Sequence, residues 1–170
     1  MKNILSAIFF CLTLISSNAQ SGKKFEYKAT RFESIIVVPK FDQSKGQGKQ
    51  GLAEFSDKDY ANNLVYDIIK SILPKEKLLK VNLASGFSIY FSTTGDVINC
   101  SFGLNPQDTG LISDEDLFNL YTKFKKTKID MNIVKITGGS DASPGEKYDY
   151  ASITGSLVPP EYRNVPRFNR

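Results

Sequence analysis

The sequence contains no histidine and no tryptophan, and it has only two cysteines among its 170 residues. A chain without histidine has no Ser-His or Cys-His nucleophile, no imidazole general base and no histidine-ligated metal. These absences exclude many of the hydrolase and metalloenzyme mechanisms that proteins of this size use. No other feature of the composition names a reaction.

The remaining composition is that of an ordinary globular chain. Hydrophobic residues make up 41% of the sequence and charged residues 24%, which excludes a disordered or collagen-like chain and allows one buried core. A length of 170 residues is typical of a single domain. The net charge of +4 gives only a weak long-range field, so we expect no nucleic-acid partner.

The N-terminus has the layout of a secretory signal peptide. Lys2 supplies a basic start and an apolar stretch follows over residues 4–15. Ser17 and Ala19 then place small residues before a cleavage point at Gln20. This layout predicts an exported product that is periplasmic or secreted.

Two other interpretations of the N-terminus fit less well. A membrane anchor needs roughly 20 continuous apolar residues, and this stretch is shorter. A lipoprotein site at Cys11 needs a small residue before it, whereas Phe10 stands there. We therefore predict a signal peptide over residues 1–19 and no membrane span after cleavage. Cys100 is then the one remaining cysteine, which excludes an internal disulfide.

Hydrophobic periodicity divides the rest of the chain into strands and helices. The strongest helix begins at Ser56 or Asp57 and ends before Pro74. A second helix begins after Ser113, where Asp116 completes a capping box. Alternation of apolar and polar residues predicts strands over 25–38 (as one or two strands), 129–136 and 148–157.

A β-hairpin is predicted over residues 87–104. Apolar residues alternate with polar ones on both sides of Thr94-Gly95-Asp96, which is typical of a tight turn because Gly95 adopts positive φ without steric cost. Cys100 lies in the returning strand, so we expect its thiol to be buried.

These elements predict a single α+β domain over residues 20–157. The order is strand, helix, hairpin, helix, strand, and we expect an antiparallel sheet with two helices packed on one face. Residues 158–170 contain three prolines and three arginines, so we predict an extended C-terminal tail.

Three motifs have an ordinary interpretation that outweighs the functional one. Gly46, Gly48 and Gly51 match the spacing of a dinucleotide-binding loop, but no helix follows at once, so a surface loop over 45–51 is expected. The glycosylation pattern at 99–101 falls inside a predicted strand rather than a loop. The lysine run at 123–128 is typical of a helix C-terminus.

Paired carboxylates can hydrolyse glycosides without histidine. The acids at 57–59 and 114–116 lie at helix starts, where negative charge stabilises the helix. Asp141, Glu146 and Asp149 flank a glycine-rich loop and lack the spacing of a calcium-binding loop. We therefore predict no catalytic pair, no metal site and no cofactor.

Tyrosines near the C-terminus are the candidate partner surface. Tyr148 and Tyr150 share one strand face, and Tyr162 follows in the tail. Exposed aromatic side chains can form a binding platform; equally, these tyrosines can cover one end of the core. Both interpretations stay open at this point.

The order of elements resembles the C-terminal domain of TonB. The resemblance is carried by SIYFSTTGDVINCSFGL (88–104), SDEDLFNLYTKFKK (113–126) and IDMNIVKI (129–136). The chain is also similar to small exported Bacteroidetes proteins of unknown function, whose signal peptides often end in Ala-Gln, as residues 19–20 do here. The resemblance implies the fold and the pairing of an exposed strand with a partner's extended segment. TonB's membrane anchor and proline-rich spacer are missing, so energy transduction is not implied.

We therefore expect an exported, non-catalytic module that binds an envelope protein or peptide, by a sheet edge or by its aromatic end face. One alternative is a small-ligand carrier with a cavity between sheet and helices. Another is a histidine-free hydrolase that uses two convergent carboxylates.

Overall fold

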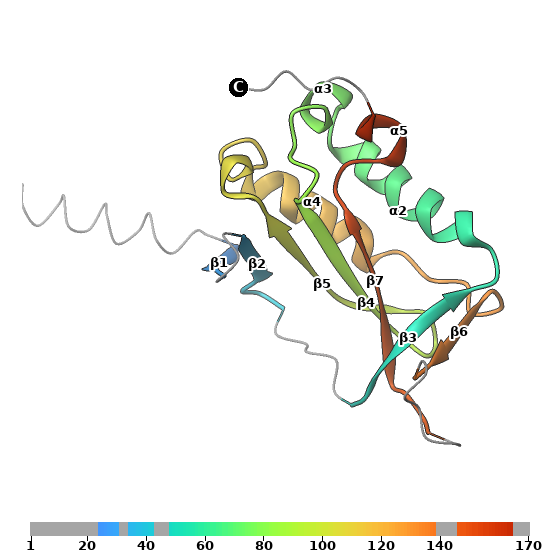
Figure 1. The fold of residues 1–170 in the computed structure, drawn as a ribbon. Coiled ribbons are helices and arrows are strands. Elements are labelled where there is room, and N and C mark those ends of the chain that lie inside the picture. The colour runs from blue at the N-terminus through green and yellow to red at the C-terminus, as the bar shows by residue number, and fades with distance from the viewer. Residues whose placement is uncertain (1–23, 31–33, 43–47, 139–145, 165–170) are drawn as a thin grey trace, which may run out of the picture.

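The computed structural model describes residues 24–30, 34–42, 48–138 and 146–164 (Figure 1). The predicted signal peptide lies outside these residues. The described chain forms one seven-stranded, mostly antiparallel sheet with four α-helices, so the α+β class is confirmed. In this part of the chain no helix has the length and apolar character that crossing a bilayer requires.

The element bounds are as follows. The strands are β1 (Phe25–Ala29), β2 (Ile35–Pro39), β3 (Gln50–Phe55), β4 (Gly86–Ser92), β5 (Val97–Leu104), β6 (Val134–Thr137) and β7 (Tyr150–Ser156). The helices are α2 (Lys58–Ile72), α3 (Lys75–Leu78), α4 (Asp114–Lys125) and α5 (Pro160–Arg163), with a short 3-10 helix η1 (Pro106–Asp108).

The strands lie side by side in the order β1-β2-β5-β4-β7-β3-β6. Every neighbouring pair is antiparallel except β3 and β7, which are parallel. The predicted hairpin is confirmed as β4 and β5 in the middle of the sheet. Its turn requires glycine, because Gly95 has φ +83° and a Cβ there would lie 2.1 Å from the Ile129 carbonyl oxygen.

The core lies on one face of the sheet. Phe87, Ile89 and Phe91 alternate along β4 and are at most 5% exposed. The Phe87 ring contacts Tyr66 of α2, with ring centroids 6.4 Å apart, and Phe124 of α4, at 6.0 Å. Figure 1 shows α4 behind β4 and β5. Alternation along the strand thus brings large apolar side chains to the helices and leaves the opposite face, which we call the open face, to other residues.

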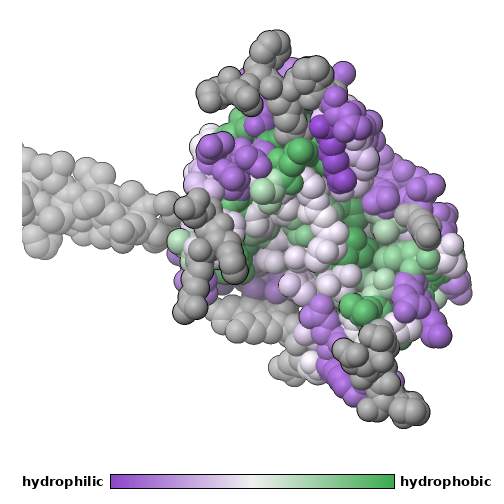
Figure 2. Space-filling view, in the orientation of Figure 1, coloured by the Kyte–Doolittle hydropathy of each residue, from purple (hydrophilic) through white to green (hydrophobic). Residues whose placement is uncertain are grey.

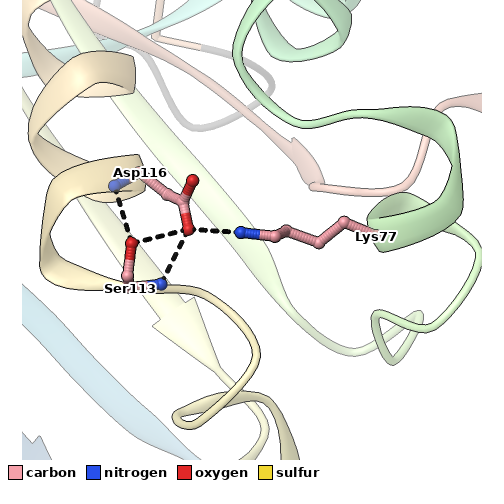
Figure 3. Close-up of polar contacts among 3 residues, drawn as sticks. All are labelled: Lys77, Ser113 and Asp116. Carbon is pink, nitrogen blue, oxygen red and sulfur yellow. Dashed lines mark hydrogen bonds and ion pairs between the residues drawn. The ribbon is translucent and has the colours of Figure 1, made fainter.

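Both long helices begin where the sequence predicts. Asp57 caps α2 by accepting hydrogen bonds from the N–H groups of Asp59 and Tyr60. Ser113 and Asp116 form the predicted capping box of α4. The Asp116 carboxylate also accepts a hydrogen bond from Lys77 Nζ at 2.7 Å (Figure 3), which ties α4 to α3.

The strand before α2 differs from the prediction. Residues 25–38 form a separate antiparallel hairpin, β1–β2, rather than the strand that leads into α2. That strand is β3, which begins at Gln50 inside the predicted 45–51 loop. The prediction missed β3 because its start is glycine-rich, a composition typical of a loop. Gly51 is nevertheless buried in this strand, where a Cβ would lie 2.5 Å from Ile136 Cγ2, so that no room is left for a side chain.

The strand predicted over 129–136 is shorter in the structure. Only Val134–Thr137 forms β6. The Asp130 carboxylate accepts hydrogen bonds from the backbone and side-chain N–H groups of Asn132, a local turn that competes with strand pairing.

The extended tail predicted for residues 158–170 is wrong where the structure describes it. Pro160–Arg163 forms helix α5, with proline at the first helical position, where its missing N–H costs nothing. Arg163 donates to the Val158 carbonyl at 3.1 Å and to Tyr66 Oη at 2.7 Å. Val158 is fully buried, so the domain continues beyond its predicted end at 157.

Candidate functional site

β1 forms one edge of the sheet, with β2 as its neighbour on one side in the described chain. In an antiparallel pair, alternate residues exchange backbone hydrogen bonds with the partner strand. Lys40 N donates to Lys24 O at 2.9 Å, and Thr30 N donates to Ser34 O at 2.8 Å. The even-numbered residues of β1 therefore bond to β2. The odd-numbered residues, whose N–H and C=O groups point away from β2, are Phe25, Tyr27 and Ala29. Phe25 is buried, so the accessible outward positions are Tyr27 and Ala29.

Helix α4 packs on β5 and reaches the β1–β2 hairpin through tyrosine–carboxylate hydrogen bonds. Tyr27 Oη donates to Asp114 at the start of α4, and Tyr121 Oη donates to Asp42, which follows β2. Burial, followed by these hydrogen bonds and the negative charge of the carboxylates, raises the pKa of Tyr27 and of Tyr121. Both phenols therefore stay protonated and keep donating.

Aromatic rings fill the space between the β1–β2 hairpin and α4. Phe41, which is 48% exposed, makes edge-to-face contacts with Phe25, Phe118 and Tyr121 at centroid distances of 5.8, 5.5 and 4.9 Å. Lys24 Nζ lies 3.5 Å from the Phe118 ring centroid, a cation–π contact. The hairpin is thus joined to the sheet by the β2–β5 ladder and to α4 by these side chains.

A surface cleft of about 350 Å³ opens beside the first residue of β1. Its lining consists of Lys24, Asp114, Glu115, Phe118 and Asn119. Four of these residues come from the first turns of α4, and Lys24 directly precedes β1. The cleft therefore offers two carboxylates, one ammonium group and an aromatic ring next to an unpaired strand edge.

The opposite edge of the sheet, β6, offers less backbone. Ser56 N donates to Ile133 O at 3.0 Å, which assigns the odd-numbered residues to the ladder with β3. Within β6, only Val134 and Ile136 then direct their backbone N–H and C=O groups away from β3. We therefore take the edge of β1, together with its cleft, as the candidate site.

The structure separates Tyr162 from the other two tyrosines that the sequence places on a partner surface. Tyr148 precedes β7 and donates to Glu146 at 2.5 Å. Tyr150 begins β7, and its ring lies 6.3 Å from that of Tyr90 on β4. Tyr162 belongs to α5, beyond the other end of β7 (Figure 1). The sequence analysis placed Tyr90 correctly in the predicted hairpin, but it did not predict that Tyr90 is the neighbour of Tyr150.

Most of the carboxylates considered for catalysis have structural partners. Lys49 N donates to Asp149 at 2.7 Å, and Lys49 Nζ forms an ion pair with Glu146. Asp141 lies outside the described residues. Asp57 and Asp116 are occupied as helix caps. Among the residues that the structure describes, no three Cys, Asp or Glu side chains form a group suited to a metal ion.

A buried polar pair escaped the sequence analysis. Ser85 is fully buried and Asp108 is 3% exposed. Ser85 Oγ donates to Asp108 at 2.6 Å and accepts from Asn105 N at 2.8 Å, while Asn82 N donates to Asp108 at 2.9 Å. The pair joins the loop before β4 to the loop after β5. Because Ser85 has no access to solvent, its hydroxyl is structural rather than nucleophilic.

The other predicted features have plain outcomes. Cys100 is fully buried, as predicted, and burial raises the pKa of its thiol. Asn99 lies within β5, so the glycosylation pattern falls inside a paired strand. Phe124 in the lysine run is buried. Gly46 lies outside the described residues.

Comparisons with known proteins give a fold and no activity. No family model matches the chain, and no curated protein matches it. The fold is similar to that of a solved structure, a DUF5043 family protein from Bacteroides uniformis ATCC 8492. The TM-score is 0.53 at 9% sequence identity, over 82% of this chain and 87% of that one. At such low identity the similarity shows a shared fold alone.

Proposed function

We propose that this chain is an exported, non-catalytic module of the cell envelope that binds an extended protein segment as an additional strand on β1. The observation that supports the proposal best is the outer edge of β1, which no other strand of the described residues pairs with. Tyr27 and Ala29 present their N–H and C=O groups outward at accessible positions, whereas Phe25 is buried, and main-chain hydrogen bonds of this kind give strand addition its affinity.

Side-chain selectivity comes from the cleft. A segment paired with β1 projects alternate side chains toward the α4 side of the sheet, where the cleft opens. The lining has two carboxylates, Asp114 and Glu115, against one ammonium group, Lys24, which already lies over the Phe118 ring. Its excess of negative charge favours a basic side chain there. The proposed ligand is therefore an extended segment with Lys or Arg at one inward position.

The resemblance to the TonB C-terminal domain agrees with this mode of binding. The order β3, α2, β4–β5, α4, β6 follows the strand-helix-hairpin-helix-strand pattern, to which β1–β2 and β7 are additions. Kinship with exported Bacteroidetes proteins of unknown function is part of the same proposal. The alternatives have less support: Lys49 engages Glu146 and Asp149, and the clefts at Lys24 and at Thr94 open at the surface rather than between sheet and helices.

A selection experiment tests strand addition and does not require a known partner. A displayed library of random 12-residue peptides (about the length of two strands) is selected on the purified protein. We expect enriched peptides that alternate apolar and polar residues and carry Lys or Arg at an inward position. Their affinity is then measured against two variants of one exposed edge residue.

The variants differ only in the outward backbone donor. Ala29→Pro removes the N–H, and proline is tolerated on the open side of an edge strand. Ala29→Ser keeps it. We expect Ala29→Pro to weaken binding about tenfold and Ala29→Ser to leave it unchanged, because tenfold corresponds to one backbone hydrogen bond of about 1.4 kcal/mol. Equal affinity of both variants, or no enriched peptide, contradicts the proposal.

Export has its own test. Mass analysis of the protein recovered from the periplasm or medium of expressing cells should show a chain that begins at Gln20. A product that stays in the cytoplasm with residues 1–19 attached contradicts the predicted cleavage.

A further inference from the structure

The open face of the sheet is uncharged across its three central strands. Register pairs lie on the same face of a sheet, so the residues opposite one another can be followed from strand to strand. The positions that the register places on this face are Asn99, Ser101 and Gly103 on β5, Gly86, Ser88, Tyr90 and Ser92 on β4, and Tyr150, Ser152, Thr154 and Ser156 on β7. Ile98, the extra residue of the β5 bulge next to Asn99, is also partly exposed. None of these residues is charged, in a chain of which 24% is charged.

A row of hydroxyl groups crosses the middle of this face. Ser88 is opposite Ser101 on one side and Thr154 on the other. Each is at least partly exposed, and none of the three side chains makes a hydrogen bond to another described residue. The row therefore presents donors and acceptors, at the strand spacing of about 4.8 Å, that the described protein does not use.

The two tyrosines of the open face also differ from five of the other tyrosines. The hydroxyls of Tyr27, Tyr60, Tyr66, Tyr121 and Tyr148 each have a hydrogen-bond partner. Tyr90 and Tyr150 pack edge to face with each other, but their hydroxyls have no partner among the described residues. Both rings are partly exposed. They offer apolar ring surface and a polar tip in one place.

Charge and large apolar side chains lie at the margins of this face. Ile36 on β2, 42% exposed, is opposite Gly103, and Leu52 on β3, 57% exposed, is opposite Ser152. Glu54 and Lys135 pair further out, on β3 and β6. Figure 2 shows the same distribution, with pale residues over the middle of the face and strongly hydrophilic ones toward its rim.

This distribution favours a neutral, hydroxyl-bearing ligand over a protein. Protein interfaces place apolar anchors at their centre and are depleted in serine, whereas here the centre is hydroxyl and the exposed aliphatic side chains lie on β2 and β3, beyond the three central strands. A charged ligand would lose hydration without meeting an opposite charge. Sugar rings carry hydroxyls that both donate and accept, together with C–H faces that pack on tyrosine rings.

We propose that the open face binds a neutral polysaccharide laid across β5, β4 and β7, with its hydroxyls on the Ser101–Ser88–Thr154 row and a sugar ring against Tyr90 and Tyr150. This site goes beyond the proposed function. It lies on the opposite side of the sheet from the cleft at β1, and either site can fail without the other.

Affinity electrophoresis of the full chain tests the proposal with β-glucan, starch, dextran and mannan as neutral probes and polygalacturonate as an anionic one. We expect at least one neutral polymer to retard the wild-type protein and polygalacturonate not to. Thr154→Lys should weaken retardation by about tenfold, because a charge replaces a hydroxyl in the central row. Asn63→Lys adds the same charge at an exposed position of α2 and should change nothing.

Unfolding midpoints are compared first, so that a misfolded variant is recognised. Tyr90→Phe and Tyr150→Phe, which keep the rings and remove only the free hydroxyls, form the second pair of variants and should each weaken retardation. The proposal is overturned if no neutral polymer retards the protein, or if Thr154→Lys and Asn63→Lys behave alike. It is also overturned if Thr154→Lys abolishes peptide binding instead, which would make this face a protein interface.

Discussion

The middle of the sheet and its β1 end are stabilised in different ways. In the middle, β4 is paired along its full length with β7 on one side and from Gly86 to Phe91 with β5 on the other. At the end, β1 is paired on one side only, and its hairpin is held to α4 by aromatic contacts and two tyrosine–carboxylate hydrogen bonds.

The difference shows where stability and binding capacity lie. In the middle of the sheet, the backbone of β4 is paired on both sides and its core-facing side chains are buried. Substitutions of these side chains should therefore lower the free energy of global unfolding. The β1 end keeps outward backbone groups, and changes there should affect binding more than stability. The following predictions test that division, beginning with the largest expected effect.

The core side of β4 should carry the largest stability cost. Phe91 is fully buried, and Phe91→Ala should lower the free energy of unfolding by about 3–5 kcal/mol. Phe41→Ala at the β1 end removes a ring that is 48% exposed and should cost about 1 kcal/mol or less, since half of its surface is already hydrated. Urea denaturation of both variants measures the two costs, and equal costs would contradict the division.

The buried pair Ser85–Asp108 should come second. Asp108→Ala leaves Asn82 N and the Ser85 hydroxyl without their acceptor, and this should cost about 1–3 kcal/mol. Asp149→Ala, which removes an exposed carboxylate from the acceptor position of Lys49 N, serves as the comparison. A smaller loss for Asp108→Ala than for Asp149→Ala in thermal unfolding would argue against the role assigned to the pair.

The tyrosine–carboxylate bonds at the β1 end should contribute about 1 kcal/mol each. Tyr121→Phe keeps the edge-to-face contact with Phe41 and removes only the donor to Asp42. We expect faster hydrogen exchange in β1 and β2 and unchanged exchange in β4. Uniform acceleration across the sheet would mean that the end does not open separately.

The link between α3 and α4 should depend on pH. Partial burial raises the pKa of Asp116, but Lys77 and Ser113 outweigh it and hold the pKa below its ordinary value of 3.8. A carboxyl whose pKa is lower in the folded state stabilises the protein above the unfolded pKa, and that contribution is lost as pH falls through the folded pKa. Asp116→Asn, which keeps an acceptor for the cap, should therefore be destabilised at pH 7 by less than about 1 kcal/mol. At pH 3 and below its difference from the wild type should shrink. A difference that grows on acidification would contradict the assigned shift.

The smallest effect on stability is expected at the outer edge itself. Ala29→Pro should unfold within about 0.5 kcal/mol of Ala29→Ser, because the removed N–H points away from β2. Lys28→Pro, one residue earlier, removes an N–H that faces β2 and should cost more. If Ala29→Pro is the more damaging of the two, the assignment of outward residues is wrong.

The sequence predicted the middle of the molecule better than its ends. Strict alternation over 87–104 and the apolar stripes before Pro74 and after Ser113 reflect local rules, and the structure follows them closely. β3 was missed because Gly51 is buried by a partner far along the chain, which no local pattern reports.

The candidate site was less predictable for the same reason. The alternating pattern predicts that Tyr27 lies in a strand. It does not predict that this strand is at the edge of the sheet, or that Tyr27 contacts Asp114, which is 87 positions away in the sequence. The tyrosines at 148, 150 and 162 looked like one surface because they are close in sequence. The turn into α5 carries Tyr162 away, and the register of β7 with β4 gives Tyr150 a different neighbour.

The claim that β1 accepts an additional strand is tested most directly by amide hydrogen exchange, measured by NMR with and without a selected peptide. We predict that the amides of Tyr27 and Ala29, which are accessible, exchange rapidly in the free protein and become protected when the peptide binds. The amide of Lys28, already bonded to β2, should change little. Protection of the β6 amides Val134 and Ile136 instead, with β1 unchanged, would contradict the claim.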